Sequence, residues 1–140
     1  MIFISSKKLL QYYLPSTLTL FMLVTIERVV ITDGGNDRLY GLPFPYITSS
    51  YGYSFHYDIY VLAMLANLLF YFLLTIFLFK LFEKLGAKLK THWLLIAIGI
   101  AVSIFWIATF ALIIQDSSFY LKTDSKYKTT DKHLIFGIRP

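Results

Sequence analysis

Three apolar runs separated by polar segments dominate the hydrophobic pattern of this chain. The run 93–114 contains neither a charge nor a proline, and the run 59–79 is also uncharged. The first run, 14–32, carries charge only at Glu27 and Arg28. An α-helix rises about 1.5 Å per residue, so the longest run would extend about 33 Å and cross the roughly 30 Å hydrocarbon core of a bilayer. The pattern therefore predicts an all-α membrane protein with three transmembrane helices.

The polar segments complete the expected organisation. Residues 1–13 form a basic and aromatic head, 80–92 a lysine-rich turn, and 115–140 a polar tail. Residues 33–58 are predicted to be an outer loop, because their glycines and prolines oppose a regular helix and their many aromatic rings favour the headgroup zone. A cleaved signal peptide is the alternative for the first run, but no small-x-small cleavage site follows it. The apolar patch 134–138 is too short to span; it could pair as a strand with a partner or lie against the bilayer.

The distribution of lysine orients the predicted spans. The head carries Lys7 and Lys8, whereas the 33–58 loop has one basic residue against three aspartates. Four lysines crowd the turn: Lys80, Lys84, Lys88 and Lys90. Basic residues close to helix ends stay in the cytoplasm, and clustered lysines there contact anionic lipid headgroups. The tail is also basic, which weighs against this assignment, but its lysines alternate with aspartates. We therefore expect a cytoplasmic N-terminus and an outer C-terminus.

Composition agrees with a membrane protein. The chain is 57% hydrophobic and 15% charged, and soluble domains contain roughly 25% charged residues. Its 140 residues leave no room for a separate soluble domain. There is no cysteine, which excludes disulfides, thiol catalysis and cysteine-ligated metal centres.

No motif in the chain predicts catalysis. The residues Asp33, Asp37, Ser54, His56 and Asp58 could sketch a metal site, but no HExxH pattern, paired histidines or acidic triplet supports it. A phosphate-binding loop and a nucleophile elbow are also absent from the sequence. We therefore expect no enzyme, no cofactor, no metal and no nucleic-acid partner.

The charged pair Glu27-Arg28 falls inside the first predicted span. Neighbouring side chains on a helix point about 100° apart, so each member needs another partner or water. Ionisable residues within a membrane are functional candidates by default. We expect an interfacial pair that ties the first helix to the outer loop; a proton- or ion-handling role and a partner contact are the alternatives.

Two of the predicted helices carry surfaces suited to packing. In the run 59–79, Asn67 and Tyr71 belong to a polar-aromatic stripe that we expect to face the first or third helix; a solute pathway is the rarer alternative. The third helix carries an alanine seam and, on an adjacent face, the pair Gly99 and Ser103. The alanine seam consists of Ala97, Ala101, Ala108 and Ala111. Small residues let helix backbones approach closely, so one surface could serve the chain's own helices and the other a partner.

One stretch of the chain resembles a group of known sequences. Asp33-Gly34, the segment 40–46 (YGLPFPY) and Asn67-Leu-Leu are similar to small uncharacterised bacterial multi-pass membrane proteins with an outer GxPFP-type loop. The resemblance covers roughly 14–82. It implies a bacterial inner membrane and brings no assigned activity, so no functional residue is carried over.

These observations favour a non-enzymatic accessory or scaffold subunit of a larger inner-membrane complex. The third helix, the outer loop and the C-terminal tail are the expected contact surfaces, with the bilayer and other membrane subunits as partners and a homo-oligomer compatible with the pattern. The alternative is a small homo-oligomeric transporter or channel. That function requires polar groups through the full bilayer depth, and only Asn67, Thr75 and Ser103 qualify.

Overall fold

A computed structural model describes most of the chain. It covers residues 5–32, 35–49, 57–86, 90, 92–115, 117–121 and 128–136, and it describes side chains for 5–27, 38–48, 57–86, 90, 92–115 and 117–121.

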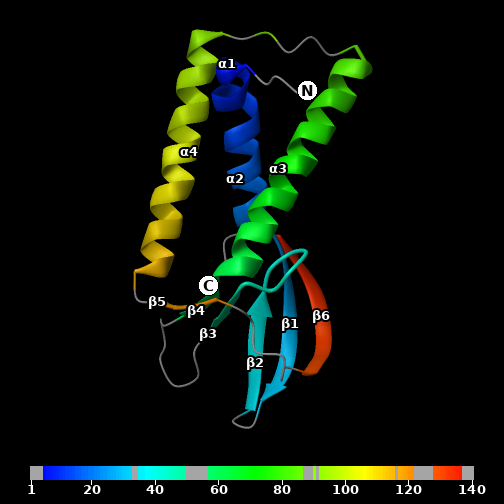
Figure 1. Cartoon of the computed structure of the whole chain (residues 1–140), viewed down its shortest axis with the longest axis vertical. Helices are drawn as coiled ribbons and strands as arrows, with labels where there is room; N and C mark the ends of the chain where they lie inside the picture. Colours follow the sequence, from blue (N-terminus) through cyan, green and yellow to red (C-terminus); the bar gives the residue numbers. More distant parts are fainter. Residues whose placement is uncertain are drawn as a thin grey trace.

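Three helical rods make up one end of the molecule (Figure 1). The first is built from α1 (Ser6–Lys8), the π-helical segment η1 (Leu9–Tyr13) and α2 (Leu14–Leu23), which follow one another without leaving helical geometry. The other two are α3 (Val61–Lys84) and α4 (Trp93–Ile114). Both long helices pack on the first rod rather than on each other, so the rod lies between them.

A six-stranded sheet occupies the opposite end (Figure 1). Its strands are β1 (Val24–Thr32), β2 (Gly35–Tyr40), β3 (Ile47–Ser49), β4 (Tyr57–Tyr60), β5 (Ser117–Tyr120) and β6 (Lys128–Phe136). They lie in the order β5-β4-β3-β2-β1-β6. Neighbours are antiparallel except β4 and β5, which are parallel. The prediction of an all-α protein with three transmembrane helices is therefore wrong, because the chain combines helices with a mixed sheet.

The first predicted transmembrane helix is interrupted between Leu23 and Val24. Helix α2 ends at Leu23, and Val24 already has extended geometry, with φ −101° and ψ 112°. The nine residues of β1, VTIERVVIT, include seven β-branched side chains, which lose rotamer freedom in a helix and pack well on a sheet. The apolar run 14–32 therefore passes from a helix into a strand.

The two predicted connecting regions outside the helices also contain strands. The segment 33–58, expected as a loop, contributes β2 and β3 and the start of β4. The tail 115–140 contributes β5 and β6, and β6 pairs with β1 of the same chain, with Val24 opposite Phe136. The apolar patch of the tail thus finds its strand partner within the chain.

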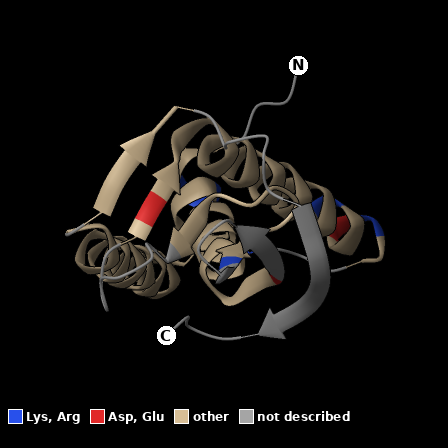
Figure 2. Ribbon diagram, turned by 90° about the horizontal axis from the view of Figure 1, so that it is seen from below, with Lys and Arg blue, Asp and Glu red and all other residues tan. Residues whose placement is uncertain are grey.

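Two helices in the described part of the chain, α3 and α4, are long and apolar enough to cross a membrane. Their ribbons carry no charged position over most of their length (Figure 2). The end of α3 and the start of α4 lie beside α1, at the opposite end of the molecule from the sheet (Figure 1). The basic head and the lysine-rich turn therefore share one end, which we call the lysine end.

The hydrophobic core lies where the helices meet the sheet. Ile59 and Ile47 from the sheet are 0% and 3% exposed, and they pack with Phe21 of α2 and Trp106 of α4. The Phe21 ring stacks on Tyr46 with centroids 5.0 Å apart. Because α2 runs directly into β1 and β4 directly into α3, this core joins the two ends into one unit.

Candidate functional site: a groove between the helices

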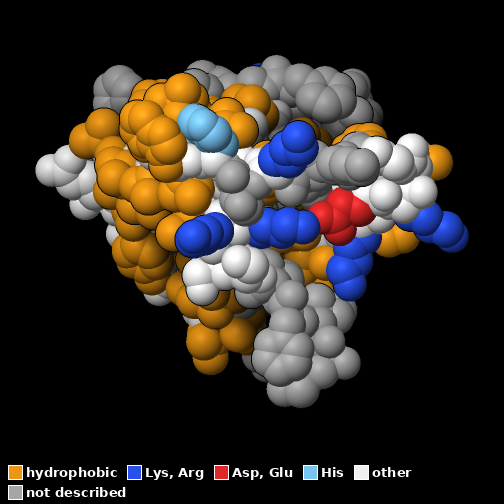
Figure 3. Space-filling view, turned by 90° about the horizontal axis from the view of Figure 1, so that it is seen from above, with side chains coloured by type: hydrophobic (Ala, Val, Ile, Leu, Met, Phe, Trp, Pro, Cys, Tyr) orange, Lys and Arg blue, Asp and Glu red, His pale blue; other side chains and the backbone are white. Residues whose placement is uncertain are grey.

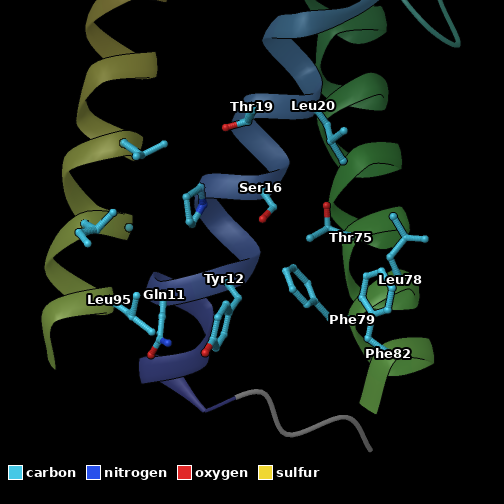
Figure 4. Close-up of a pocket in the computed structure, with 14 residues that line it drawn as sticks. Gln11, Tyr12, Ser16, Thr19, Leu20, Thr75, Leu78, Phe79, Phe82 and Leu95 are labelled. Atoms are coloured by element: carbon cyan, nitrogen blue, oxygen red, sulfur yellow. The ribbon is translucent and has the colours of Figure 1, made fainter. Parts of the chain in front are cut away.

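A groove opens between α3 and α4, with the first helical rod as its floor (Figure 4). Its volume is about 460 Å³, within the roughly 300–1,000 Å³ typical of small-molecule pockets. Its walls are apolar side chains of the two long helices: Leu78, Phe79 and Phe82 from α3, and Leu95, Ile98 and Val102 from α4. The groove therefore presents a hydrocarbon-like surface at the depth of the two candidate membrane helices.

The floor of the groove combines the apolar Pro15 and Leu20 with several polar side chains, and most of these polar groups are bonded within the protein. At the lysine end, Gln11 Nε2 and the Tyr12 hydroxyl both donate to the backbone carbonyl of Lys90, at 3.1 and 2.7 Å. Further along, Trp106 Nε1 donates to Thr19 Oγ1 at 2.9 Å. Ser16 of α2 and Thr75 of α3 complete the polar lining (Figure 4). These bonds hold the floor in place and tie the start of α4 to the rod.

Basic side chains surround the lysine end of the groove. Lys8 Nζ lies 2.6 Å from Glu83 Oε1, and this hydrogen bond raises the pKa of Lys8 above its ordinary value. Four further lysines of this end are described and exposed: Lys7, Lys80, Lys84 and Lys90. Lys88, also predicted to contact headgroups, lies outside the described residues. Seen from this end, blue basic groups flank the red acidic group beside a broad hydrophobic area (Figure 3). The entrance is therefore positively charged.

The predicted stripe on α3 supports the junction with the sheet instead of lining a pathway. Asn67 is fully buried, and its amide bonds the backbone of Phe44 twice: Phe44 N–H donates to Oδ1 at 2.9 Å and Nδ2 donates to the carbonyl at 2.6 Å. Tyr71 donates its hydroxyl proton to the Val24 carbonyl at 2.8 Å, where α2 becomes β1. The hydrogen-bond partner of Asn67 is thus the turn between β2 and β3, whereas the Tyr71 ring packs edge-on against Phe21 of α2.

The two small-residue faces of α4 have different environments. Gly99 and Ser103 are buried, and a Cβ on Gly99 would overlap the Leu10 carbonyl oxygen, so this face allows α4 to approach η1 closely. The alanine seam lies on the other side of the helix, and its four members are exposed: Ala97, Ala101, Ala108 and Ala111. In the described structure, one face thus packs on the chain itself and the other is uncovered.

Glu27 belongs to the sheet and not to a membrane helix. Both Glu27 and Arg28 belong to strand β1, and the side chain of Arg28 lies outside the described part. Glu27 Oε1 lies 3.1 Å from Arg38 Nη1 and accepts a hydrogen bond from Tyr40 at 3.4 Å. Burial, followed by the Glu27 charge, raises the pKa of the Tyr40 hydroxyl. The expected pair at the end of a first transmembrane helix is therefore corrected to a cross-strand pair of β1 and β2.

Most residues of the metal site considered around His56 and Asp58 lie outside the described part of the chain, because Asp33, Ser54 and His56 are not described. Within the described residues, no three His, Cys, Asp or Glu side chains come together. The expectation of no metal therefore stays a prediction.

The sequence analysis missed the floor of the groove. Gln11, Tyr12, Ser16 and Thr19 recur at spacings of one, four and three, which places several of them along one helical face. That periodicity is the signal that could have identified them, but it crosses the predicted boundary between the basic and aromatic head, 1–13, and the first predicted span, 14–32. No protein family, no curated protein and no solved structure matches this chain.

Proposed function

We propose that this chain is a non-enzymatic accessory or scaffold subunit of a larger complex in the bacterial inner membrane. In this proposal α3 and α4 cross the bilayer, the lysine end faces the cytoplasm and the sheet lies outside. The resemblance of the 40–46 segment supports the bacterial placement, and the excess of lysine beside the helix ends supports the orientation.

The observation that carries the proposal is the uncovered alanine seam of α4. Its residues recur at helical spacing on the side opposite to the buried Gly99 and Ser103, and lipid tails gain nothing from small side chains, whereas a second helix does. The surface continues at the sheet end in β5, an edge strand where Phe119 and Tyr120 are about half exposed. A membrane helix of a partner subunit, with an outer segment reaching β5, fits this combination.

The test is purification from the native membrane in a mild detergent, followed by mass spectrometry of the proteins that stay bound. We expect a partner at fixed stoichiometry that is lost from the double variant Ala101→Leu/Ala108→Leu. The variant Leu69→Phe is the control, because it adds bulk at an exposed position of the other long helix, α3, and leaves the seam unchanged. A homo-oligomer without partners that conducts ions in liposomes would instead establish the transporter or channel alternative.

The orientation has a separate test. A reporter fused after residue 140 is expected outside the cytoplasm, together with the sheet. Activity of a cytoplasm-specific reporter at this position would overturn the proposed orientation without affecting the assignment of a partner surface.

A further inference from the structure

The groove between α3 and α4 is open along its side, at the depth where the proposed function places lipid. Phe82, Leu95 and Ile98 from its walls are 49%, 43% and 51% exposed. A groove of about 460 Å³ with such walls would be filled by hydrocarbon in a bilayer, since water gains few hydrogen bonds there. The occupant is therefore an apolar chain.

The position of the charges defines the other part of the occupant. Gln11 and Tyr12 line the groove and bond the Lys90 carbonyl, so Lys90 stands at the lysine end of the groove. Lys8 precedes Gln11 and Tyr12 by one helical turn and therefore shares their side of the rod. Glu83, the only described acid at this end, is already paired with Lys8. The lysine end of the groove therefore carries a net positive charge, because Glu83 is the only described acidic residue among several lysines there.

We propose that the groove binds one anionic phospholipid, with an acyl chain between α3 and α4 and the phosphate beside Lys90 and Lys8. This inference rests on the membrane placement in the proposed function and adds the ligand class. Basic pockets between membrane helices on the cytoplasmic side are the usual setting for anionic headgroups. Charge complementarity therefore selects phosphatidylglycerol-type lipid over zwitterionic lipid of the same chain length.

The experiment measures lipid binding to the purified full-length chain in a neutral detergent by native mass spectrometry. Phosphatidylglycerol and phosphatidylcholine with identical acyl chains are titrated separately. We expect tighter binding of phosphatidylglycerol, and we expect Lys90→Gln to reduce that preference about fivefold, the order set by one lysine near a lipid surface. Lys84→Gln is the matched control: Lys84 follows the groove residue Phe82 by two positions, about 200° around the helix, and so points away.

A second pair of variants tests the acyl site. Val102→Phe fills the groove and is expected to abolish binding of both lipids, whereas Ile107→Phe adds the same ring on the exposed side of α4 and leaves binding intact. Circular dichroism and gel filtration check that Val102→Phe folds; Ser16→Phe, which fills the groove from the floor, replaces it if it does not. Free palmitate at equal concentration is expected to compete weakly, since it lacks the phosphate.

Equal binding of the two lipids, or equal losses in Lys90→Gln and Lys84→Gln, overturns the headgroup assignment and with it the proposal. Unchanged binding in both groove-filling variants does the same. The measurement uses the isolated chain and leaves the alanine seam unaltered, so a negative result leaves the partner proposal standing. If the purified chain binds the lipid but no partner protein co-purifies with it, only the proposal of an accessory subunit is contradicted.

Discussion

In α3 the large apolar side chains point outward, whereas in the sheet they point inward. Leu65, Leu69 and Phe77 are 52%, 58% and 63% exposed, while Leu39, Ile47 and Ile59 are at most 3% exposed. Exposed surface of this kind along a whole helix is costly in water and normal in lipid. The described side chains of β2, β3 and β4 bury their large apolar groups within the protein, and only the edge strand β5 exposes Phe119 and Tyr120.

The two ends also differ in how polar groups are used. At the sheet end, Asn67 and Tyr71 reach across to the backbone of other segments. Along the helices, hydroxyls such as those of Thr75 and Ser103 bond the carbonyl four residues earlier in their own helix. Long-range polar bonds also join the helices, from Trp106 to Thr19 and from Gln11 and Tyr12 to the Lys90 carbonyl. The difference is that the bonds of the sheet end come from the more deeply buried side chains, Asn67 and Tyr71.

The largest expected effect comes from removing the amide that joins α3 to the turn after β2. Asn67→Leu leaves the Phe44 N–H and carbonyl without their partner, and we expect a loss of about 2–4 kcal/mol in the free energy of unfolding in detergent. Thr75→Val removes a buried hydroxyl from the same helix and is expected to cost about 1 kcal/mol. That hydroxyl donates to the Tyr71 carbonyl of its own helix at 2.7 Å and meets the Thr17 hydroxyl of α2 only at 3.4 Å. Equal losses of unfolding free energy in the two variants would contradict the larger contribution assigned to the Asn67 amide.

Helix packing is tested at Gly99. Gly99→Ala places a Cβ against the Leu10 carbonyl, and the resulting shift of α4 is expected to cost about 1–3 kcal/mol. Ala97→Val on the exposed side of the same helix is the control, with an expected change within about 0.5 kcal/mol. Both are measured by reversible denaturation monitored by circular dichroism. A stable Gly99→Ala variant would show that α4 does not rest closely on η1.

The same chemical change at each end gives a smaller contrast. Tyr71→Phe removes the buried bond to the Val24 carbonyl and is expected to cost about 0.5–1.5 kcal/mol. Tyr12→Phe removes an exposed bond to the Lys90 carbonyl, where water replaces the partner, and is expected to change the thermal midpoint much less. The reverse order of the two midpoints would contradict the inference that the more deeply buried bonds of the sheet end contribute more to stability.

The smallest effect is the pH dependence of the Lys8–Glu83 pair. Glu83 raises the pKa of Lys8 in the folded state, so the pair's stabilisation is present below the ordinary lysine pKa of 10.5 and is lost as pH rises through the higher folded value. Both side chains are about one-third exposed, which limits the contribution to about 1 kcal/mol or less. Lys8→Met should lower the thermal midpoint at pH 8, and this difference should shrink as the pH rises past 10.5. Lys7→Met should leave the midpoint unchanged throughout.

The sequence identifies the two long helices because their signal is local. An uncharged run of the length of α4 has few alternatives in a chain of this size, and neither α3 nor α4 contains a proline. The sheet is different, because β1 follows α2 without a polar break, and hydropathy does not separate a helix from a strand when both are apolar. The run of β-branched residues from Val24 to Thr32 was the available signal.

The site was harder to predict than the helices. The groove exists because α3 and α4 both lean on the same rod, an arrangement that no local pattern encodes. Asn67 belongs to the predicted stripe, but its hydrogen-bond partner, Phe44, is brought to it by the pairing of β2, β3 and β4. The pairing of distant segments therefore decided both the misassigned fold and the unpredicted contacts.

The pairing of β1 with β6 has a consequence for biogenesis. β1 is synthesised before both long helices, yet the strand that covers its second edge comes after them, with Thr25 opposite Ile135. At roughly 5–20 residues per second, the ribosome needs about 5–20 s to make the intervening chain. During that interval the β1 edge is open to other strands. In the proposed membrane placement, α3 and α4 must be inserted and β6 brought to the same side as β1 before the open edge of β1 pairs with another strand.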